Sequence, residues 1–455
     1  MYNNQTHKTT FATRLGIIFA TAGSAVGLGN IWHFPTTCGK NGGAAFVLLY
    51  IIITILLGIP GMLSEFIVGR NGGSDPVSSY AKAGGRRLFG IIGALGALGG
   101  SLILGFYSVV AGWCVFYLIL ALRNGALGTT AQIEATFNHL MAPDNWIPIA
   151  LSVVFILITH LIIVRGVRKG IEVASKIMVP TLIVLLILLI GASCSLPGAW
   201  HGIHFLLNPD FNKINAEVVF KALGEAFFSL SLGTACLCTY ASYFKDETNL
   251  LQSTVQIVFI DVAVAMMAGL MIFPAAFAAG VEPDAGPSLV FMTMPNVFVQ
   301  AFPPVLAYIV SVLFYLLLTI AALTSTISMH EIGTAVLSQE TPLSRRGAAR
   351  VVTIVCSVIG MLSAYSLSHE GWGLFGDTFF DNFDKLTANI MLPLGALFTM
   401  LIVGWVMPRY TVLKQLTSYG RYGWVIWMID AFYLMARYVC PIMIICIFLY
   451  KIGLI

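Results

Sequence analysis

An asparagine and an aspartate, Asn30 and Asp261, stand inside long apolar stretches of this 455-residue chain. A carboxylate at membrane depth costs several kcal/mol unless it is paired or solvated. An acid and an amide are residue types that can bind a cation or hydrogen-bond a polar ligand. We therefore expect Asp261 to have a partner or a function rather than to be a packing residue.

Two apolar stretches also carry glycine and serine where a helix needs good helix formers. One runs from Gly23 to Asn30 and holds three glycines, and the other runs from Ser229 to Gly233. Glycine weakens an exposed helix interior by about 1 kcal/mol relative to alanine. The two stretches predict broken helices or, alternatively, close packing of helices through small residues. The residues alone favour neither reading.

The composition is that of a membrane protein. Hydrophobic residues make up 58% of the chain and charged residues 10%, whereas a soluble domain has about 25% charged residues. The apolar blocks are roughly 20 residues long, which is the length that a helix needs to cross the hydrocarbon core. Backbone amides in lipid must be paired within the protein, so these blocks predict helices. We expect an all-α integral membrane protein that contacts the lipid bilayer and binds no nucleic acid.

About eleven transmembrane helices are predicted, in one domain that covers residues 1–455. Helices 1–5 span about 13–195, helices 6–10 about 217–407, and an extra helix 11 about 424–450. The two broken stretches open the two blocks of five, as helices 1 and 6. Interrupted segments at corresponding positions of two halves are a sequence signature of a transporter binding site. The spans are expected at about 13–37, 43–69, 88–122, 147–165, 171–195, 217–243, 252–280, 301–338, 349–367, 382–407 and 424–450.

Lysine and arginine gather in the loops on the side of the N-terminus, among them Arg70, Arg165 and Arg345. The positive-inside rule then predicts a cytoplasmic N-terminus. With an odd number of spans, the C-terminus is expected outside the cell.

Specific motifs resemble those of the neurotransmitter:sodium symporter family. The run Gly23–Trp32 with the following Phe34-Pro35 is similar to the family's first helix, and 41–46 extends the similarity. Phe227–Gly233 resembles its sixth helix, 323–325 its eighth and 389–395 its tenth. The resemblance covers about residues 11–406. It implies a 5+5 inverted repeat and a secondary symporter, not an enzyme, in the plasma membrane of a bacterium.

The resemblance also implies two sodium sites, which an unwound helix can serve with carbonyl oxygens that a continuous helix has already used. The alternative for the hydroxyls of Thr324 and Ser325 is hydrogen bonding to their own helix. The first sodium would be bound by Ala25, Asn30, Ser229 and Asp261, and the second by Gly23, Val26, Ala321, Thr324 and Ser325.

Chloride is not expected to be a cofactor. Chloride-dependent relatives place an asparagine at the position of Asp261, with a serine and a glutamine nearby. This chain has Ala265 and Glu225 at the latter two positions. A fixed negative charge at Asp261 can balance sodium in place of the anion. The role of Glu225 stays open.

The expected substrate is a neutral L-amino acid. Free amides at a helix N-terminus suit a carboxylate, and Tyr107 would add a hydroxyl. Amine-transporting members carry an aspartate at the position of Gly27, whereas glycine leaves room for the carboxylate of the substrate. Thr234 stands where several relatives have a bulkier residue, which suggests a mid-sized or aromatic side chain. The substrate contacts would be Ser24, Ala25, Leu28, Gly29, Ile103, Tyr107, Phe228, Ser229, Ser231, Thr234, Ser325 and Met329.

The gates depart from the family pattern. The outer gate of relatives is an arginine–aspartate pair, and the same positions here are His33 and Asp384. On the inner side, Lys8 and Phe11 replace an arginine and a tryptophan, and Gln339 replaces an acid. Ser242 and Tyr243 keep the family pattern on that side. Glu65 is expected to accept hydrogen bonds from unwound backbone amides.

Other functions stay open at this point. A sodium-coupled carrier of an osmolyte or amine keeps the fold, although Gly27 argues against an amine. A sodium-dependent amino-acid sensor with slow turnover is a different class. The chain has no nucleotide-binding loop and no metalloprotease motif. It is expected to act as a monomer or a weak homo-oligomer.

Overall fold

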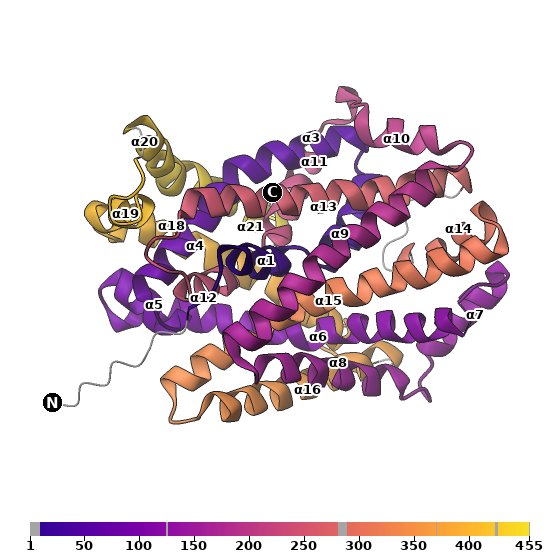
Figure 1. The fold of residues 1–455 in the computed structure, drawn as a ribbon, viewed down its shortest axis with the longest axis horizontal. Coiled ribbons are helices and arrows are strands. Elements are labelled where there is room, and N and C mark those ends of the chain that lie inside the picture. The colour runs from indigo at the N-terminus through magenta and orange to yellow at the C-terminus, as the bar shows by residue number, and fades with distance from the viewer. Residues whose placement is uncertain (1–9, 124–125, 281–288, 370, 424–425, 455) are drawn as a thin grey trace.

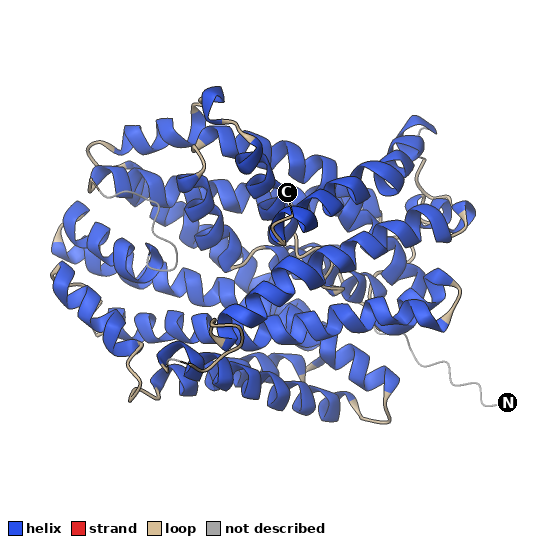
Figure 2. Ribbon diagram, turned by 180° about the vertical axis from the view of Figure 1, so that it is seen from behind, coloured by secondary structure: helices blue, strands red, loops and turns tan. Residues whose placement is uncertain are grey.

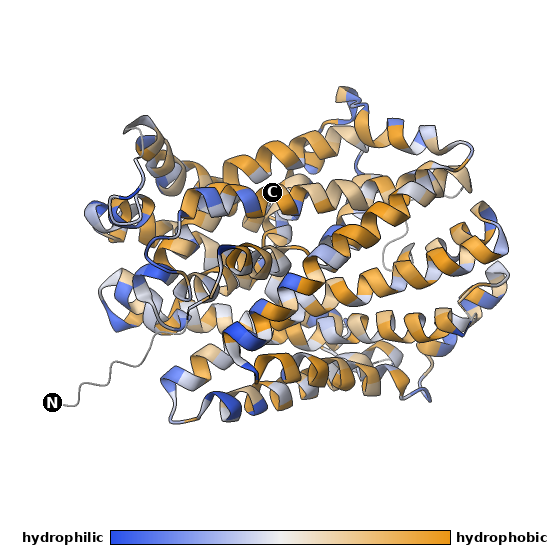
Figure 3. Ribbon diagram, in the orientation of Figure 1, coloured by the Kyte–Doolittle hydropathy of each residue, from blue (hydrophilic) through white to orange (hydrophobic). Residues whose placement is uncertain are grey.

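The computed structural model describes residues 10–123, 126–280, 289–369, 371–423 and 426–454. Within these residues the regular structure is helical and contains no strand (Figure 2). Most helices run roughly along the long axis of the molecule, with turns and short helices at both ends (Figure 1). Hydrophilic residues gather mainly at these ends, and hydrophobic residues cover the long helices (Figure 3). This is the distribution expected of helices that cross a bilayer.

The first half of the chain holds the helices at the positions of the first five expected spans. The first span consists of α1 (Arg14–Ala25), η1 (Gly29–His33) and α2 (Phe34–Lys40). The second consists of α3 (Ala44–Ile53), η2 (Thr54–Gly58) and α4 (Ile59–Gly72). The others and their connections are α5 (Pro76–Gly84), η3 (Arg87–Phe89), α6 (Gly90–Leu122), α7 (Thr130–Leu140), α8 (Ile147–Ile163), η4 (Val167–Ile171), α9 (Glu172–Cys194), α10 (Ala199–Leu207) and η5 (Phe211–Lys213).

The second half begins with another interrupted segment, α11 (Ala216–Ser229) and α12 (Cys236–Ser242). The long helices α13 (Leu250–Ala278) and α15 (Pro304–Glu340) follow, and both pack against α1 and α9. The remaining elements are η6 (Leu289–Thr293), α14 (Met294–Ala301), α16 (Arg345–Ser368), α17 (Phe379–Leu386), η7 (Thr387–Met391), α18 (Leu392–Leu401), η8 (Ile402–Val406), α19 (Arg409–Leu416), α20 (Ile426–Leu434), η9 (Met435–Val439) and α21 (Cys440–Lys451).

Eight helices of the described residues are long and apolar enough to cross a membrane, or nine with the bent pair of the first span. The two other expected spans correspond to α8, which is a shorter apolar helix, and to the interrupted pair α11 and α12. The count of eleven therefore stays a prediction, although a helix or helix pair lies at every expected position.

Both predicted helix breaks are present. The first span bends by 51° between Ala25 and Gly29, where Val26 is extended. In the second break Ser231, Gly233 and Ala235 have φ angles of 54°, 84° and 60°. A Cβ atom on Gly233 would lie 2.0 Å from the carbonyl oxygen of Leu392. The backbone of α18 thus approaches the break so closely that only glycine fits there.

Candidate functional site

The two helix breaks meet at a buried carboxylate, that of Asp261 on α13. Asn30 Nδ2 donates to Asp261 Oδ1 at 2.7 Å, and Ser229 Oγ lies 2.9 Å from each carboxylate oxygen. Tyr50 OH donates to Oδ2 at 3.1 Å. Asn30, Tyr50 and Asp261 are 0% exposed, and Ser229 is 4% exposed. Three expected ligands of the first sodium thus lie together in the protein interior.

The cluster around Asp261 holds neutral donors and no cation. Among the described residues, no lysine, arginine or histidine forms an ion pair with this carboxylate. A buried charge is costly unless an opposite charge or several hydrogen bonds compensate it. The cluster is therefore suited to a small cation that prefers oxygen ligands. Tyr50 was missed in the sequence because a tyrosine inside an apolar span looks like a packing residue.

The expected second sodium site lies where α15 meets the first break. Thr324 Oγ1 lies 3.0 Å from the carbonyl oxygen of Val26 and 2.8 Å from that of Ala321. The second contact is the hydrogen bond to its own helix that sequence analysis left as the alternative. Gly23 also faces this side, because a Cβ on it would lie 3.5 Å from Thr324 Cβ. These contacts join α1 and α15 through oxygen atoms.

The amides of the first break face a tyrosine of α6. The N–H of Leu28 donates to Tyr107 OH at 3.1 Å. A Cβ on Gly27 would lie 2.2 Å from Ser325 Oγ and 3.3 Å from Tyr107 OH. A Cβ on Gly29 would lie 3.2 Å from the ring of Phe228. The surroundings of Gly27 thus leave no room for an aspartate side chain without movement of its neighbours.

The two breaks are joined directly as well. Ser231 Oγ donates to the carbonyl oxygen of Ser24 at 3.1 Å. Thr234 Oγ1 donates to the carbonyl oxygen of Ser231 at 2.8 Å, so this hydroxyl is already engaged. Ile103 is buried and Met329 half-buried in the apolar core. Their contact with a substrate stays a prediction.

Glu65 of α4 supports the second break. Its carboxylate accepts hydrogen bonds from the N–H of Gly233 at 2.7 Å and from the N–H of Cys238 at 3.4 Å. These amides lack partners because the helix is interrupted before α12. The structural role that we expected for Glu65 is confirmed.

Four residues contact one another on the side of the bundle where α1 begins. Phe11 is 0% exposed and packs edge-on against the ring of Tyr243, with 6.0 Å between the ring centroids. Tyr243 OH donates to Glu331 Oε1 at 2.6 Å. Arg345 binds both carboxylate oxygens of Glu331, at 2.8 and 2.6 Å. We call Phe11, Tyr243, Glu331 and Arg345 the N-side network.

Sequence reasoning anticipated Phe11 and Tyr243 but missed Glu331 and Arg345. An acid inside the long apolar α15 was the available signal, of the same kind that singled out Asp261. Gln339, which was expected near Phe11, accepts hydrogen bonds from Ser74 Oγ and from the N–H of Asp75. Ser242 donates within its own helix, to Thr239 O at 2.7 Å. Lys8 lies outside the described residues.

The other end of the first span carries a different arrangement. His33 Nδ1 lies 2.6 Å from Glu225 Oε2, and the described residues form no ion pair between His33 and Asp384. The expected pair is thus replaced, because Glu225 projects from α11 directly at the imidazole. Asp384 and Lys451 lie within electrostatic range of His33. We call His33, Glu225, Asp384 and Lys451 the far-side network.

Phe228 lies beneath this network. Its ring centroid is 5.4 Å from that of His33, and both Phe228 and Tyr107 are half-buried. The aromatic pair expected under the outer gate is thus close to the amides of the first break. The polar centre of the molecule lies between the N-side and far-side networks.

Comparisons with known proteins agree with this geometry. The model of the sodium:neurotransmitter symporter family matches residues 8–138 and 132–454. The sodium-dependent transporter YhdH of Bacillus subtilis is 37% identical, over 98% of each chain. A sodium-dependent transporter of Haemophilus influenzae is 33% identical, over 99% of each. The crystal structure of MhsT in complex with L-phenylalanine matches with a TM-score of 0.88 and 36% identity, over 97% of this chain and 99% of that one. The chain therefore belongs to the sodium:neurotransmitter symporter family.

Proposed function

We propose that this sodium-dependent membrane transporter is a symporter that imports a neutral L-amino acid with sodium, independently of chloride. The observation that carries the proposal is the buried Asp261 carboxylate between the two helix breaks. It is surrounded by Asn30, Ser229 and Tyr50 and has no ion-pair partner among the described residues. A sodium ion would supply the missing positive charge. The carbonyl oxygens of Ala25 and Ser229 would be further ligands of this ion.

The charge of Asp261 also supports chloride independence. Ala265 is fully buried and offers no hydroxyl to an anion. Glu225, at the position where relatives use a glutamine for chloride, presents a carboxylate to His33 instead. The carboxylates of Asp261 and Glu225 would repel an anion, so the protein itself would provide the charge that balances sodium.

The substrate would bind where the free amides of the first break lie beside Tyr107. Its carboxylate would replace the contact between the Leu28 N–H and Tyr107 OH. The neighbours of Gly27 leave no room for a side chain with a carboxylate at this position. The protein therefore favours a substrate that has a carboxylate group itself. A bulky neutral side chain is favoured because MhsT, a structural relative of 36% identity, was solved with L-phenylalanine.

Transport would occur by alternating access to this central site. The N-side network would close the cytoplasmic end and the far-side network the outer end. This assignment places the N-terminus in the cytoplasm and the C-terminus outside, in the plasma membrane of a bacterium. The gathering of lysine and arginine in loops on the side of the N-terminus supports it.

The test is thermal unfolding of the detergent-purified protein against the twenty L-amino acids. Each is added in sodium chloride, sodium gluconate and potassium chloride. A ligand that binds only the folded protein raises its melting temperature. We expect a rise with a few neutral amino acids, aromatic ones among them, in both sodium salts and not in potassium.

Asp261→Asn is expected to abolish the sodium-dependent rise. Asp430→Asn, which removes an exposed acid of α20, is the matched control and should keep the sodium-dependent rise.

A rise in melting temperature that requires chloride in the unmodified protein would disprove the role given to Asp261. Silence across the panel, with the protein folded, would favour an osmolyte as cargo. Binding without uptake in proteoliposomes would favour a sensor.

A further inference from the structure

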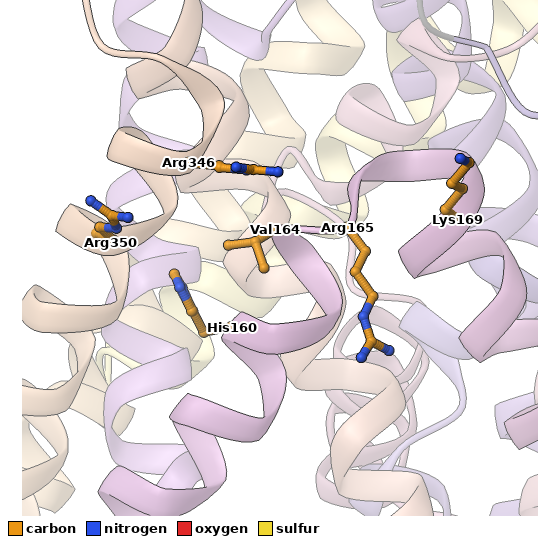
Figure 4. Close-up of a pocket in the computed structure, with 6 residues that line it drawn as sticks. All are labelled: His160, Val164, Arg165, Lys169, Arg346 and Arg350. Atoms are coloured by element: carbon orange, nitrogen blue, oxygen red, sulfur yellow. The ribbon is translucent and has the colours of Figure 1, made fainter.

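A cavity of about 450 Å³ opens near the end of α8, on the side of the N-side network. It is lined by His160, Val164, Arg165, Lys169, Arg346 and Arg350, and we call it the basic cavity. The cationic side chains come from two directions (Figure 4). Arg346 and Arg350 project from α16, whereas Arg165 lies in the turn after α8 and Lys169 lies in η4.

No acid balances this charge. Within the described residues, the four lysine and arginine side chains that line the cavity form no ion pair. Residues 1–9, which precede the nearby α1, contain no aspartate or glutamate. The arginines that precede Arg346 and Lys169 in the sequence do have partners. Arg345 forms an ion pair with Glu331, and Arg168 donates a hydrogen bond to the carbonyl oxygen of Thr10 at 2.7 Å. Four cations without an acid partner among the described residues thus line one cavity, whereas their two neighbours in the sequence are engaged.

The backbone makes the cavity still more positive. Arg346 lies in the first turn of α16, which has no acid there, so its charge adds to the positive end of the helix dipole. Arg346 and Arg350 are four residues apart, a spacing at which like charges destabilise a helix. His160 is oriented by a 2.8 Å contact between its Nδ1 and Thr353 Oγ1. These costs are removed if an anion binds between the side chains.

Apolar side chains continue from the cavity along the outside of the bundle. Leu161 on α8 is 57% exposed and Ile354 on α16 is 62% exposed. Ile177 on α9 is 63% exposed. In a membrane protein such side chains contact acyl chains. A molecule with a phosphate at one end and acyl chains at the other matches both surfaces, which a free phosphate does not.

We propose that the basic cavity binds the phosphate headgroup of an anionic phospholipid of the adjacent leaflet. Arg346 and Arg350 hold the phosphate from α16, Arg165 holds it from the turn after α8, and Lys169 holds it from η4. The acyl chains lie along the exposed apolar faces of α8 and α16. Guanidinium groups suit this task because they bind phosphate oxygens through paired hydrogen bonds. The bound lipid then joins α8 to α16.

The experiment measures the melting temperature of the purified protein in neutral detergent. Phosphatidylglycerol, phosphatidylcholine or inorganic phosphate is added at equal concentration and constant ionic strength. Native mass spectrometry counts retained lipid in parallel. The variants are Arg346→Gln/Arg350→Gln, and Val164→Trp, which fills the cavity but keeps every charge. The matched control is Arg86→Gln/Arg87→Gln, which removes two exposed cations outside the cavity.

We expect phosphatidylglycerol to stabilise the unmodified protein and the control more than phosphatidylcholine does. Arg346→Gln/Arg350→Gln should bind phosphatidylglycerol about tenfold more weakly or worse, since two charge-assisted hydrogen bonds are lost. Val164→Trp should weaken binding as well, although its net charge is unchanged. An equal response in both double variants would overturn the proposal, because binding would then follow general charge. Inorganic phosphate that stabilises as well as phosphatidylglycerol would overturn the assignment to a lipid.

Discussion

The N-side and far-side networks lie toward opposite ends of the first span and differ in their chemistry. In the N-side network, Glu331 is 0% exposed and both of its carboxylate oxygens are bound by Arg345. In the far-side network, Glu225 is also buried, but its Oε1 has no hydrogen-bond partner. Its other oxygen meets His33, whose side chain is 57% exposed.

The difference lies in which cation holds the buried acid. A guanidinium stays charged at any ordinary pH and binds a carboxylate through two parallel hydrogen bonds. An imidazole changes its charge between about pH 5 and pH 8 and offers one hydrogen bond here. The N-side network thus keeps its ion pair at any ordinary pH, whereas the strength of the far-side network is expected to depend on pH. We infer that the far side opens more easily.

The largest effect is expected from removing the cation of the N-side network. Arg345→Met leaves the buried carboxylate of Glu331 without its cation and with only the hydrogen bond from Tyr243, which should lower the free energy of unfolding by about 3–5 kcal/mol. It should also increase hydrogen–deuterium exchange of the amides in α12. The control is Arg87→Met, an exposed arginine on the same side, which should change stability by less than about 0.5 kcal/mol. Equal losses in both variants would show that the ion pair of Arg345 with Glu331 does not stabilise the N-side network as described.

Phe11→Ala should have the next largest effect. It removes a fully buried ring from the N-side network, and deleting a buried phenylalanine costs about 3 kcal/mol or more. The far-side counterpart is Phe228→Ala, which removes a half-buried ring and should cost less. Chemical denaturation of both variants measures the difference. A larger loss for Phe228→Ala would reverse the comparison between the two ends.

A substitution of Gly27, which lies between the two networks, should lower stability by a smaller amount and through overpacking. Gly27→Ala places a methyl group 2.2 Å from Ser325 Oγ, and such overpacking costs about 1–3 kcal/mol. Gly27→Ala/Ser325→Ala should recover most of that stability. The double variant should still lose sodium-dependent stabilisation, because the hydroxyl of Ser325 is a predicted ligand. If the double variant stays as unstable as Gly27→Ala, the steric clash is not with the hydroxyl of Ser325.

The smallest change in stability is expected in the far-side network. The pair of His33 and Glu225 is partly exposed, so Glu225→Gln should change stability by about 1 kcal/mol or less. The ion pair exists only while the imidazole is protonated, so its contribution is present at low pH and disappears as pH rises. Melting temperatures from pH 5 to pH 8 should show this dependence in the unmodified protein and not in Glu225→Gln. His33→Arg should give a far side that is stable across this range and releases substrate more slowly. A pH dependence that persists in both variants would exclude this pair as its source.

Much of the fold could be predicted from the sequence because it depends on local features. Apolar blocks of membrane length gave helix ends within a few residues, and the glycines of the two interrupted stretches marked both breaks. Asp261 was recognised because an acid inside an apolar block is costly wherever the helix lies. The pairings between distant elements were harder. The position of Glu225 on α11 was known, but which group it faces depends on the rotation of that helix. Tyr50 was missed because a tyrosine in an apolar span looks like a packing residue, and Glu331 was missed although an acid in an apolar helix was the same signal that marked Asp261.

The contact between α4 and α12 has a consequence for how this molecule can move. Glu65 holds the amides of Gly233 and Cys238, and a Cβ on Gly69 would lie 2.0 Å from the carbonyl oxygen of Cys238. Backbone touches backbone here, so sliding one helix past the other would break hydrogen bonds and create steric clashes. We therefore expect α4 and α12 to travel as one rigid body. The hinge that separates them from α11 is then expected between Ser231 and Ala235, where Ser231, Gly233 and Ala235 have positive φ angles that depart from a helix.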